Sequence, residues 1–185
     1  MRKVPRSVGL ITLLGVSLAI VVCAKLAAAE EPCATFTWNV RHERALFGGK
    51  SQPVVAGQRL AASPTLTIDK LYQLKLSRQS VITFVAPTHR KAGSDGVYAG
   101  LVRLTVDTPG VHRISLDQPI WVDVLVNGAA LPAKDFQGRP ACNAPHKIVE
   151  FELPAGAPLI LQFSGGQLPT AKVAVTRAPA AAAGP

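Results

Sequence analysis

The stretch VEFELPAGAPLILQFSGG, residues 149–166, decides the fold of this chain. Its two halves, 149–153 and 159–163, place apolar residues at every second position. A period of two puts successive side chains on opposite faces of a β-strand, so one face of each half belongs to a core. Pro154-Ala155-Gly156, between the halves, has the composition of a tight turn. The stretch therefore predicts two short antiparallel strands joined by a turn.

The same alternation recurs outside this stretch. It predicts further strands at 34–40, 72–76, 102–106, 114–116 and 173–175. The segment from Ile120 to Val126 is apolar on both faces apart from Asp123, which predicts a buried central strand. Residues typical of turns recur at 108–110, 127–128, 154–156 and 164–166.

Helical periodicity is nearly absent from the chain. The segment from Arg41 to Phe47, stopped by Gly48-Gly49, is the one helical candidate, and residues 48–64 have so little period that we expect them to cross the surface. Short strands joined by turns at these spacings are typical of sandwiches. The predicted fold is all-β, an antiparallel β-sandwich of jelly-roll type with at most one short helix.

The N-terminal 29 residues have the pattern of a signal peptide. Arg2, Lys3 and Arg6 precede an apolar run from Val8 to Val22, and Ala27-Ala28-Ala29 then precedes Glu30. An uncleaved anchor is the alternative, but the run of about 15 residues is shorter than the ~20 that span a bilayer. We therefore expect cleavage before Glu30, no membrane span after it, and a periplasmic or secreted protein. One β-sandwich domain is expected over 30–177, followed by a disordered Ala/Pro tail at 178–185.

The charge of the chain excludes one class of partner. The formal net charge is +9, but removal of residues 1–29 takes away four cations and no acid, which leaves +5. The remaining cations are scattered among eleven acids, without a block of like charges. We expect no nucleic-acid partner.

Two cysteines, Cys33 and Cys142, remain after the signal peptide is removed. In an oxidising compartment they most simply form one intramolecular disulfide, which would close a loop of about 110 residues. The alternatives are two free thiols or pairing between chains.

Trp121 and Asp123 are the candidate ligand-binding residues. They share one face of a strand, where a tryptophan can stack on a sugar ring while a carboxylate accepts its hydroxyl protons. The alternative is that Trp121 fills the core. Because the strand is apolar on both faces, burial of Trp121 is the prediction.

His146 and Glu150 are the candidate metal ligands, and they share the outward face of a strand. The pair resembles part of the cupin metal motif, but the first histidine of that motif is replaced here by Ala144. A solvated edge face is the preferred interpretation. His112 is expected in the core or at its rim, and His89 in a polar loop. Nucleophile and dinucleotide motifs are missing from the sequence, and Gly93-Ser94-Asp95-Gly96 suits a plain turn better than a calcium loop. No catalytic residue and no cofactor is therefore predicted.

Two resemblances to known families accompany these patterns. Pro109–Leu116, Ile120–Val126 and Val149–Gly156 resemble the bacterial pre-peptidase C-terminal jelly-roll over residues 98–177, which implies a module of the kind appended to secreted enzymes. Cys33–Val40, Glu43–Phe47, Trp121–Val124 and His146–Glu150 resemble a group of small exported proteobacterial proteins of unknown role, which are sometimes labelled homogentisate dioxygenase.

Three functions are compatible with the sequence. The leading hypothesis is an exported non-catalytic β-sandwich that binds an envelope component, a carbohydrate or a protein partner. One alternative is a small cupin-like metal-dependent enzyme that uses His146 and Glu150 with a histidine from elsewhere. The other is a structural or stress-related envelope protein without a small ligand.

Overall fold

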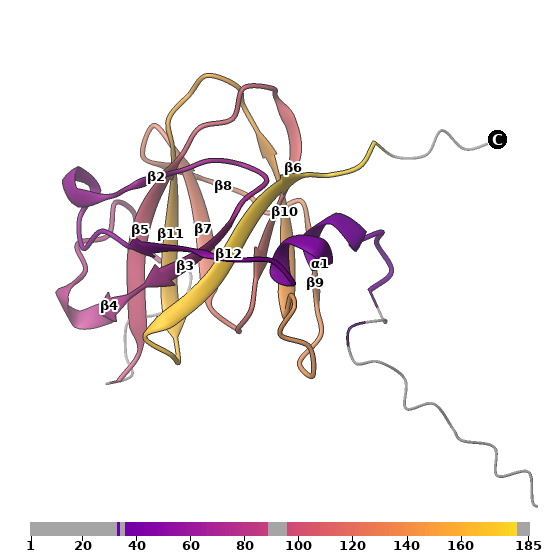
Figure 1. The fold of residues 1–185 in the computed structure, drawn as a ribbon. Coiled ribbons are helices and arrows are strands. Elements are labelled where there is room, and N and C mark those ends of the chain that lie inside the picture. The colour runs from indigo at the N-terminus through magenta and orange to yellow at the C-terminus, as the bar shows by residue number, and fades with distance from the viewer. Residues whose placement is uncertain (1–32, 34–35, 89–95, 181–185) are drawn as a thin grey trace, which may run out of the picture.

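The predicted β-sandwich is confirmed by the computed structural model, which describes residues 33, 36–88 and 96–180 (Figure 1). In this part of the chain, twelve strands form two sheets. Sheet A has the order β1 (Gln52–Val55), β3 (Leu71–Lys75), β12 (Thr170–Arg177), β6 (Gly110–Leu116), β10 (Lys147–Leu153), β9 (Asp135–Gly138). Sheet B has the order β2 (Thr65–Leu66), β5 (Tyr98–Leu104), β11 (Leu159–Gly166), β7 (Trp121–Val126), β8 (Ala129–Leu131), with β4 (Ser77–Arg78) beside β5.

The core lies between the sheets and consists of the alternating apolar residues. Leu74, Ile114 and Phe151 enter it from sheet A, and Val124 and Phe163 enter it from sheet B. Burial of one face of each strand is the main stabilising term for such a sandwich. The predicted buried strand is β7, whose residues Val122 to Leu125 are buried on both faces.

Two of the pairings at sheet edges are parallel, although the prediction was antiparallel throughout. β1 pairs with β3 in parallel, and β2 pairs with β5 in parallel. Residues 48–64 are mostly exposed, as the prediction that they cross the surface requires, and they also contain β1 and a 3₁₀ turn at Leu60–Ala62. β1 has only four residues, too few to show a period.

The predicted turn at 127–128 is confirmed. Asn127 and Gly128 have φ values of 49° and 80°, as a type I′ hairpin requires, and they join β7 to β8. The turn predicted at 164–166 is wrong, because these residues belong to β11 as a β-bulge. The register with β5 shifts between Phe163 and Gly166, and Gly165 has φ +67° and donates its N–H to Gln79 Oε1 at 2.7 Å.

The N-terminal part of the domain covers the outer face of sheet A. The predicted helix is confirmed as α1 (Arg41–Phe47), which lies against β12 (Figure 1). Its Phe47 packs on Leu71 and Ala174. The strand predicted at 34–40 is wrong over residues 36–40, which form no strand, while 34 and 35 lie outside the described residues. Its aromatic residues stack on cations instead: Trp38 lies against Arg113 and Phe36 against Arg139, with 4.8 and 5.3 Å between guanidinium carbon and ring centroid.

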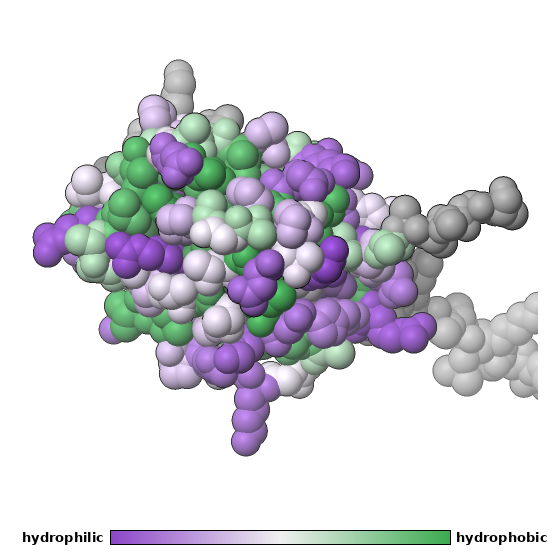
Figure 2. Space-filling model, turned by 90° about the horizontal axis from the view of Figure 1, so that it is seen from above, coloured by the Kyte–Doolittle hydropathy of each residue, from purple (hydrophilic) through white to green (hydrophobic). Residues whose placement is uncertain are grey.

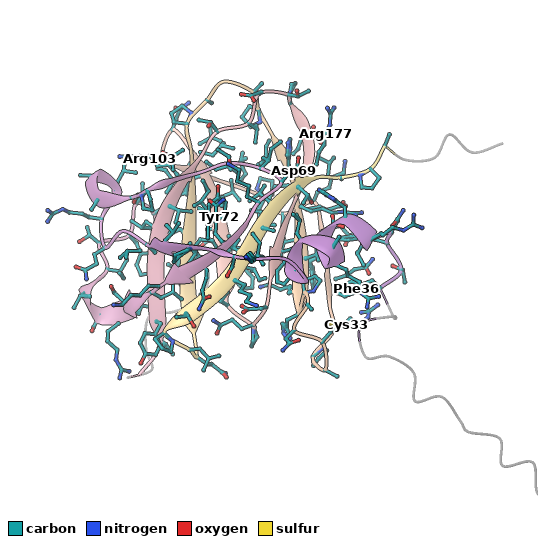
Figure 3. All side chains as sticks on the ribbon, viewed as in Figure 1. Cys33, Phe36, Asp69, Tyr72, Arg103 and Arg177 are labelled. Atoms are coloured by element: carbon teal, nitrogen blue, oxygen red, sulfur yellow. A yellow bond between two sulfur atoms is a disulfide. The ribbon has the colours of Figure 1, made fainter. Side chains whose placement is uncertain are left out.

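The predicted disulfide is confirmed: Cys33 and Cys142 are joined, with an S–S distance of 2.03 Å. Cys33 and Phe36 lie on the α1 side of the molecule (Figure 3). The bridge therefore attaches the start of the domain to the connection between β9 and β10.

The remaining predictions about the chain concern its two ends and a membrane span. The signal peptide, its cleavage before Glu30 and residues 181–185 of the tail lie outside the described residues. Ala178 is still attached to the sandwich, because its N–H donates to Val111 O at 2.9 Å. In the described part of the chain, no helix has the length and apolar character needed to cross a bilayer.

Candidate functional site

The candidate site is an apolar cleft at one edge of the sandwich, where β7 faces β9 and β10. It is lined by Trp121, Val122, Ala133, Phe136, Lys147 and Val149, and it has a volume of about 160 Å³. At ~30 Å³ per water molecule, that is room for about five waters, or for one large side chain or ring. We call it the Trp121–Phe136 cleft.

The cleft exists because β8 is shorter than its neighbours. β8 has three residues and pairs with β7 only at Val124–Val126, so it does not reach Trp121–Asp123. Pro132 follows β8, and proline has no N–H to continue a ladder. The chain then crosses to β9, where Phe136 lies opposite Val149 of β10. Sheet A therefore extends beyond sheet B, and the inner face of β9 is left uncovered.

Trp121 is half-exposed, with 41% of its surface accessible, so the predicted burial of this residue is wrong. It is the first residue of β7, and with Asp123 it lies on the strand face opposite to Val122 and Val124, which point into the core. Its indole Nε1–H donates to Asp123 Oδ1 at 2.8 Å. This bond fixes the orientation of the ring before any ligand arrives, which lowers the entropy lost on binding.

Asp123 lies beside Trp121, as the shared strand face predicted, but it has a different role from the one expected. It is only 4% exposed. Its carboxylate therefore orients the Trp121 ring and presents little surface to a ligand.

Phe136 was not identified from the sequence, although 65% of its surface is exposed. It lies in the four-residue strand β9, which is too short to give a period. Its only sequence signal is a large apolar residue among polar neighbours, Asp135 and Gln137. Such a residue is ordinarily found in a core or at an interface.

Lys147 contributes the one charged group of the cleft. Its ammonium donates to Ile120 O at 2.6 Å and lies 5.6 Å from the centroid of the Trp121 ring. The rest of the lining is almost entirely carbon. Such a site favours an apolar group and disfavours one that brings several hydroxyls without partners.

The candidate metal ligands lie elsewhere. Glu150 is largely buried on the outer face of sheet A, where its Oε1 accepts from Arg113 Nε at 2.9 Å. The interpretation of this face as a solvated edge is therefore wrong for Glu150, because the N-terminal segment and α1 cover it. In the described residues, no three His, Cys, Asp or Glu side chains are grouped as metal ligands would be.

His146 lies near Asp117 and Lys172, at the end of β6. Burial raises the pKa of Asp117 above its ordinary value of 3.8, against the opposing effects of a hydrogen bond from the Lys172 N–H and the positive charges of Lys172 and His146. His112 is buried, with Nδ1 2.9 Å from Gly110 O, so its predicted place in the core or rim is confirmed. His89 and the loop residues 93–95 lie outside the described residues.

The comparison with known proteins gives no family for this chain. No protein-family model matches the sequence, and no curated protein matches it. The geometry of the cleft is therefore the basis of the functional argument.

Proposed function

We propose that this protein is an exported, non-catalytic β-sandwich that binds a protein partner in the cell envelope through the Trp121–Phe136 cleft. The observation that carries the proposal is the pair of exposed aromatic residues that flank an apolar cleft. Tryptophan and other aromatic residues next to a pocket are typical of the centres of protein interfaces. The signal-peptide pattern of residues 1–29 and the Cys33–Cys142 disulfide support export.

The chemistry of the lining favours a protein partner over a carbohydrate. A sugar ring needs hydrogen-bonding partners for its hydroxyls as well as a stacking surface. Here Asp123 is buried and bonded to the indole, and the Lys147 ammonium donates to Ile120 O. An apolar side chain needs no such partners, and its transfer from water into the cleft is favourable. A protein partner that presents one large apolar side chain is therefore the best fit.

The other large apolar side chains that are exposed in the described part of the chain lie outside the Trp121–Phe136 cleft. Apolar and polar side chains are interspersed on the face seen in Figure 2, with more apolar ones on the side of β2 and β5 and more hydrophilic ones on the side of α1. Val55 and Val81 are also exposed, but they line broader hollows at the opposite edge of the sandwich. Val81 serves below as the matched control for Phe136.

The test is site-specific photo-crosslinking in the host that produces the protein. A photoreactive phenylalanine analogue replaces Phe136 in one variant and Val81 in the other, and adducts from intact cells are identified by mass spectrometry. We expect a discrete protein adduct from position 136 that Trp121→Ala removes, and none from position 81. Equal adducts from both positions, or binding on a glycan array that Trp121→Ala abolishes, would overturn the proposal.

The variants used in this test are expected to remain folded. Trp121 is half-exposed and Phe136 is largely exposed, so Trp121→Ala and Phe136→Ala should each lower the free energy of unfolding by less than about 2 kcal/mol. Phe163→Ala, a fully buried comparison on β11, should cost about 3–5 kcal/mol. Urea unfolding of the three variants measures the difference. A loss as large for Trp121→Ala as for Phe163→Ala would show that Trp121 belongs to the core.

A further inference from the structure

We infer that the partner binds as an extended β-strand, which pairs with the open edge of β7 at Val122 and inserts one large apolar side chain into the Trp121–Phe136 cleft. The inference rests on the proposed function and specifies how the same site is used. It follows from the hydrogen-bonding groups at the two strand edges that border the cleft.

The edge of β7 is open next to the cleft. In a two-residue hairpin, the residues that flank the turn exchange both backbone hydrogen bonds, so Val126–Ala129 and Val124–Leu131 are the bonded pairs. Alternate residues of a strand direct their N–H and C=O to the same edge. Val122 therefore directs both groups toward the β8 side, past the end of β8. In the described part of the chain, no strand pairs with Val122 across this edge.

The neighbouring group on that edge confirms the alternation. Ile120, two residues before Val122, has its carbonyl on the same side, and this carbonyl accepts from Lys147 Nζ at 2.6 Å. The side chain of Lys147 therefore closes the edge at Ile120. The N–H and C=O of Val122 lie between that closure and the end of β8.

The edge of β9, on the other side of the cleft, is partly closed. The Phe136 N–H donates to Asp135 Oδ1 at 2.7 Å, and Gly138 O accepts from Arg139 Nη1 at 2.8 Å. Side chains that occupy the backbone groups of an edge strand prevent pairing with another chain. Of the two edges that border the cleft, that of β7 therefore offers the better place for a partner strand.

The position of the apolar side chain follows from strand geometry. A residue placed opposite Val122 has its side chain on the same face of the sheet as Val122, which is the inner face. Across the cleft from that face lie Val149 and the exposed Phe136 of sheet A. The partner therefore has one large apolar residue opposite Val122, with polar residues before and after it that face the solvent.

The test uses peptides selected against the purified mature domain. A phage library of random nine-residue peptides is enriched on the wild-type protein, and an enriched peptide is synthesised with single N-methyl groups along its backbone. We expect N-methylation to weaken binding about fivefold to tenfold at one position only, that of the residue whose N–H faces Val122, since it removes that hydrogen bond. We also expect the Val122 amide to become protected from hydrogen exchange, while Phe136→Ala weakens binding at least about tenfold and Val81→Ala does not.

The outcomes separate failure of the inference from failure of the proposed function. Binding that depends on Phe136 but tolerates N-methylation at every position would overturn strand addition and leave the protein-binding cleft in place. Enriched peptides that bind equally well to Phe136→Ala would overturn both. If no peptide is enriched and ultracentrifugation finds a dimer that Phe136→Ala dissociates, the occupant is a second copy of this chain and the inference is wrong.

Discussion

Arg113 joins the outer face of sheet A to the N-terminal segment. Its guanidinium donates to Glu150 Oε1 at 2.9 Å and to Asn39 O at 2.8 Å, and it lies 3.3 Å from Glu43 Oε1. Thr176 donates to the same oxygen of Glu43, which is only 1% exposed. One buried cation thus compensates two buried carboxylates, an arrangement that is costly to disturb.

Arg113→Met should therefore be strongly destabilising. It leaves Glu43 and Glu150 buried without a cation, and we expect the free energy of unfolding to fall by about 3–5 kcal/mol. Lys134→Met removes the exposed Lys134–Glu152 ion pair, whose charged atoms are 3.7 Å apart. This variant should change the free energy of unfolding by about 1 kcal/mol or less. Urea unfolding at neutral pH compares the two. A small effect of Arg113→Met would mean that water enters this network and screens its charges.

Asp117 makes stability depend on pH. Burial raises its pKa in the folded protein, so the ionised form is less favourable there than in the unfolded chain. The stabilising contribution of this group is complete below pH 3.8, the ordinary value, and is lost as the pH rises through the folded value. Asp117→Asn does not titrate. Its melting temperature relative to wild type should therefore be higher at pH 7 than at pH 3.

The exposed Asp107 supplies the control for that experiment, because Asp107→Asn should show the same difference from wild type at both pH values. If Asp117→Asn instead loses stability relative to wild type as the pH rises, then Lys172 and His146 stabilise the charged carboxylate more than burial destabilises it.

The half-exposure of Trp121 could not be predicted from its strand. Apolar residues on both parities of 120–126 correctly indicated a strand covered on both faces, and Val122 to Leu125 are buried. Whether the first residue of the strand shares that cover depends on segments elsewhere in the chain. The indole N–H bond to Asp123 gives the ring a polar partner at this boundary.

At the scale of elements, the bulge in β11 depends on two glycines. Gly165 has φ +67°, where any other residue costs about 1–2 kcal/mol. A Cβ on Gly166 would lie 2.8 Å from Ile120 Cδ1. We expect Gly165→Ala to lower the free energy of unfolding by about 1–2 kcal/mol. Gly166→Ala should lower it by a larger amount than Gly165→Ala does, because Ile120 must move.

Gly138→Ala is the comparison for these variants, since the nearest atom to its Cβ would be His146 O at 3.9 Å. It should be neutral or slightly stabilising, because alanine restricts the unfolded chain more than glycine does. Thermal melts of the three variants should therefore give the highest melting temperature for Gly138→Ala, a lower one for Gly165→Ala and the lowest for Gly166→Ala. Equal melting temperatures would show that the bulge relaxes without cost.

Sequence patterns predicted the long strands and missed the short ones for one physical reason. Strands such as β10 and β11 have seven and eight residues, enough for alternation to be seen. β2, β4 and β8 have two or three residues, and their partners decide their conformation. The same cause concealed the cleft, because it arises where the short β8 ends before β7 does.

At the scale of the whole molecule, the disulfide closes most of the domain into one loop. Cys33 and Cys142 are 109 residues apart. The chain-entropy treatment gives about 4–5 kcal/mol for a loop of this length. The double variant Cys33→Ala/Cys142→Ala, and wild type in reductant, should both unfold at lower urea concentration than oxidised wild type. Reductant should leave the double variant unchanged. A wild-type midpoint that reductant does not shift would mean that the bridge adds little to stability.

The place of β12 in sheet A has a consequence for how the protein is made. β12 holds the last eight residues of the sandwich, yet it lies between β3 and β6 and joins the two halves of the sheet. A ribosome or a translocation channel releases the chain from its N-terminus, so the strand that closes the sheet emerges last. Until Thr170 is free, β1–β3 and β6–β10–β9 share no neighbour, and these long-range pairings cannot be completed. The strand order therefore delays completion of sheet A until β12 has been released.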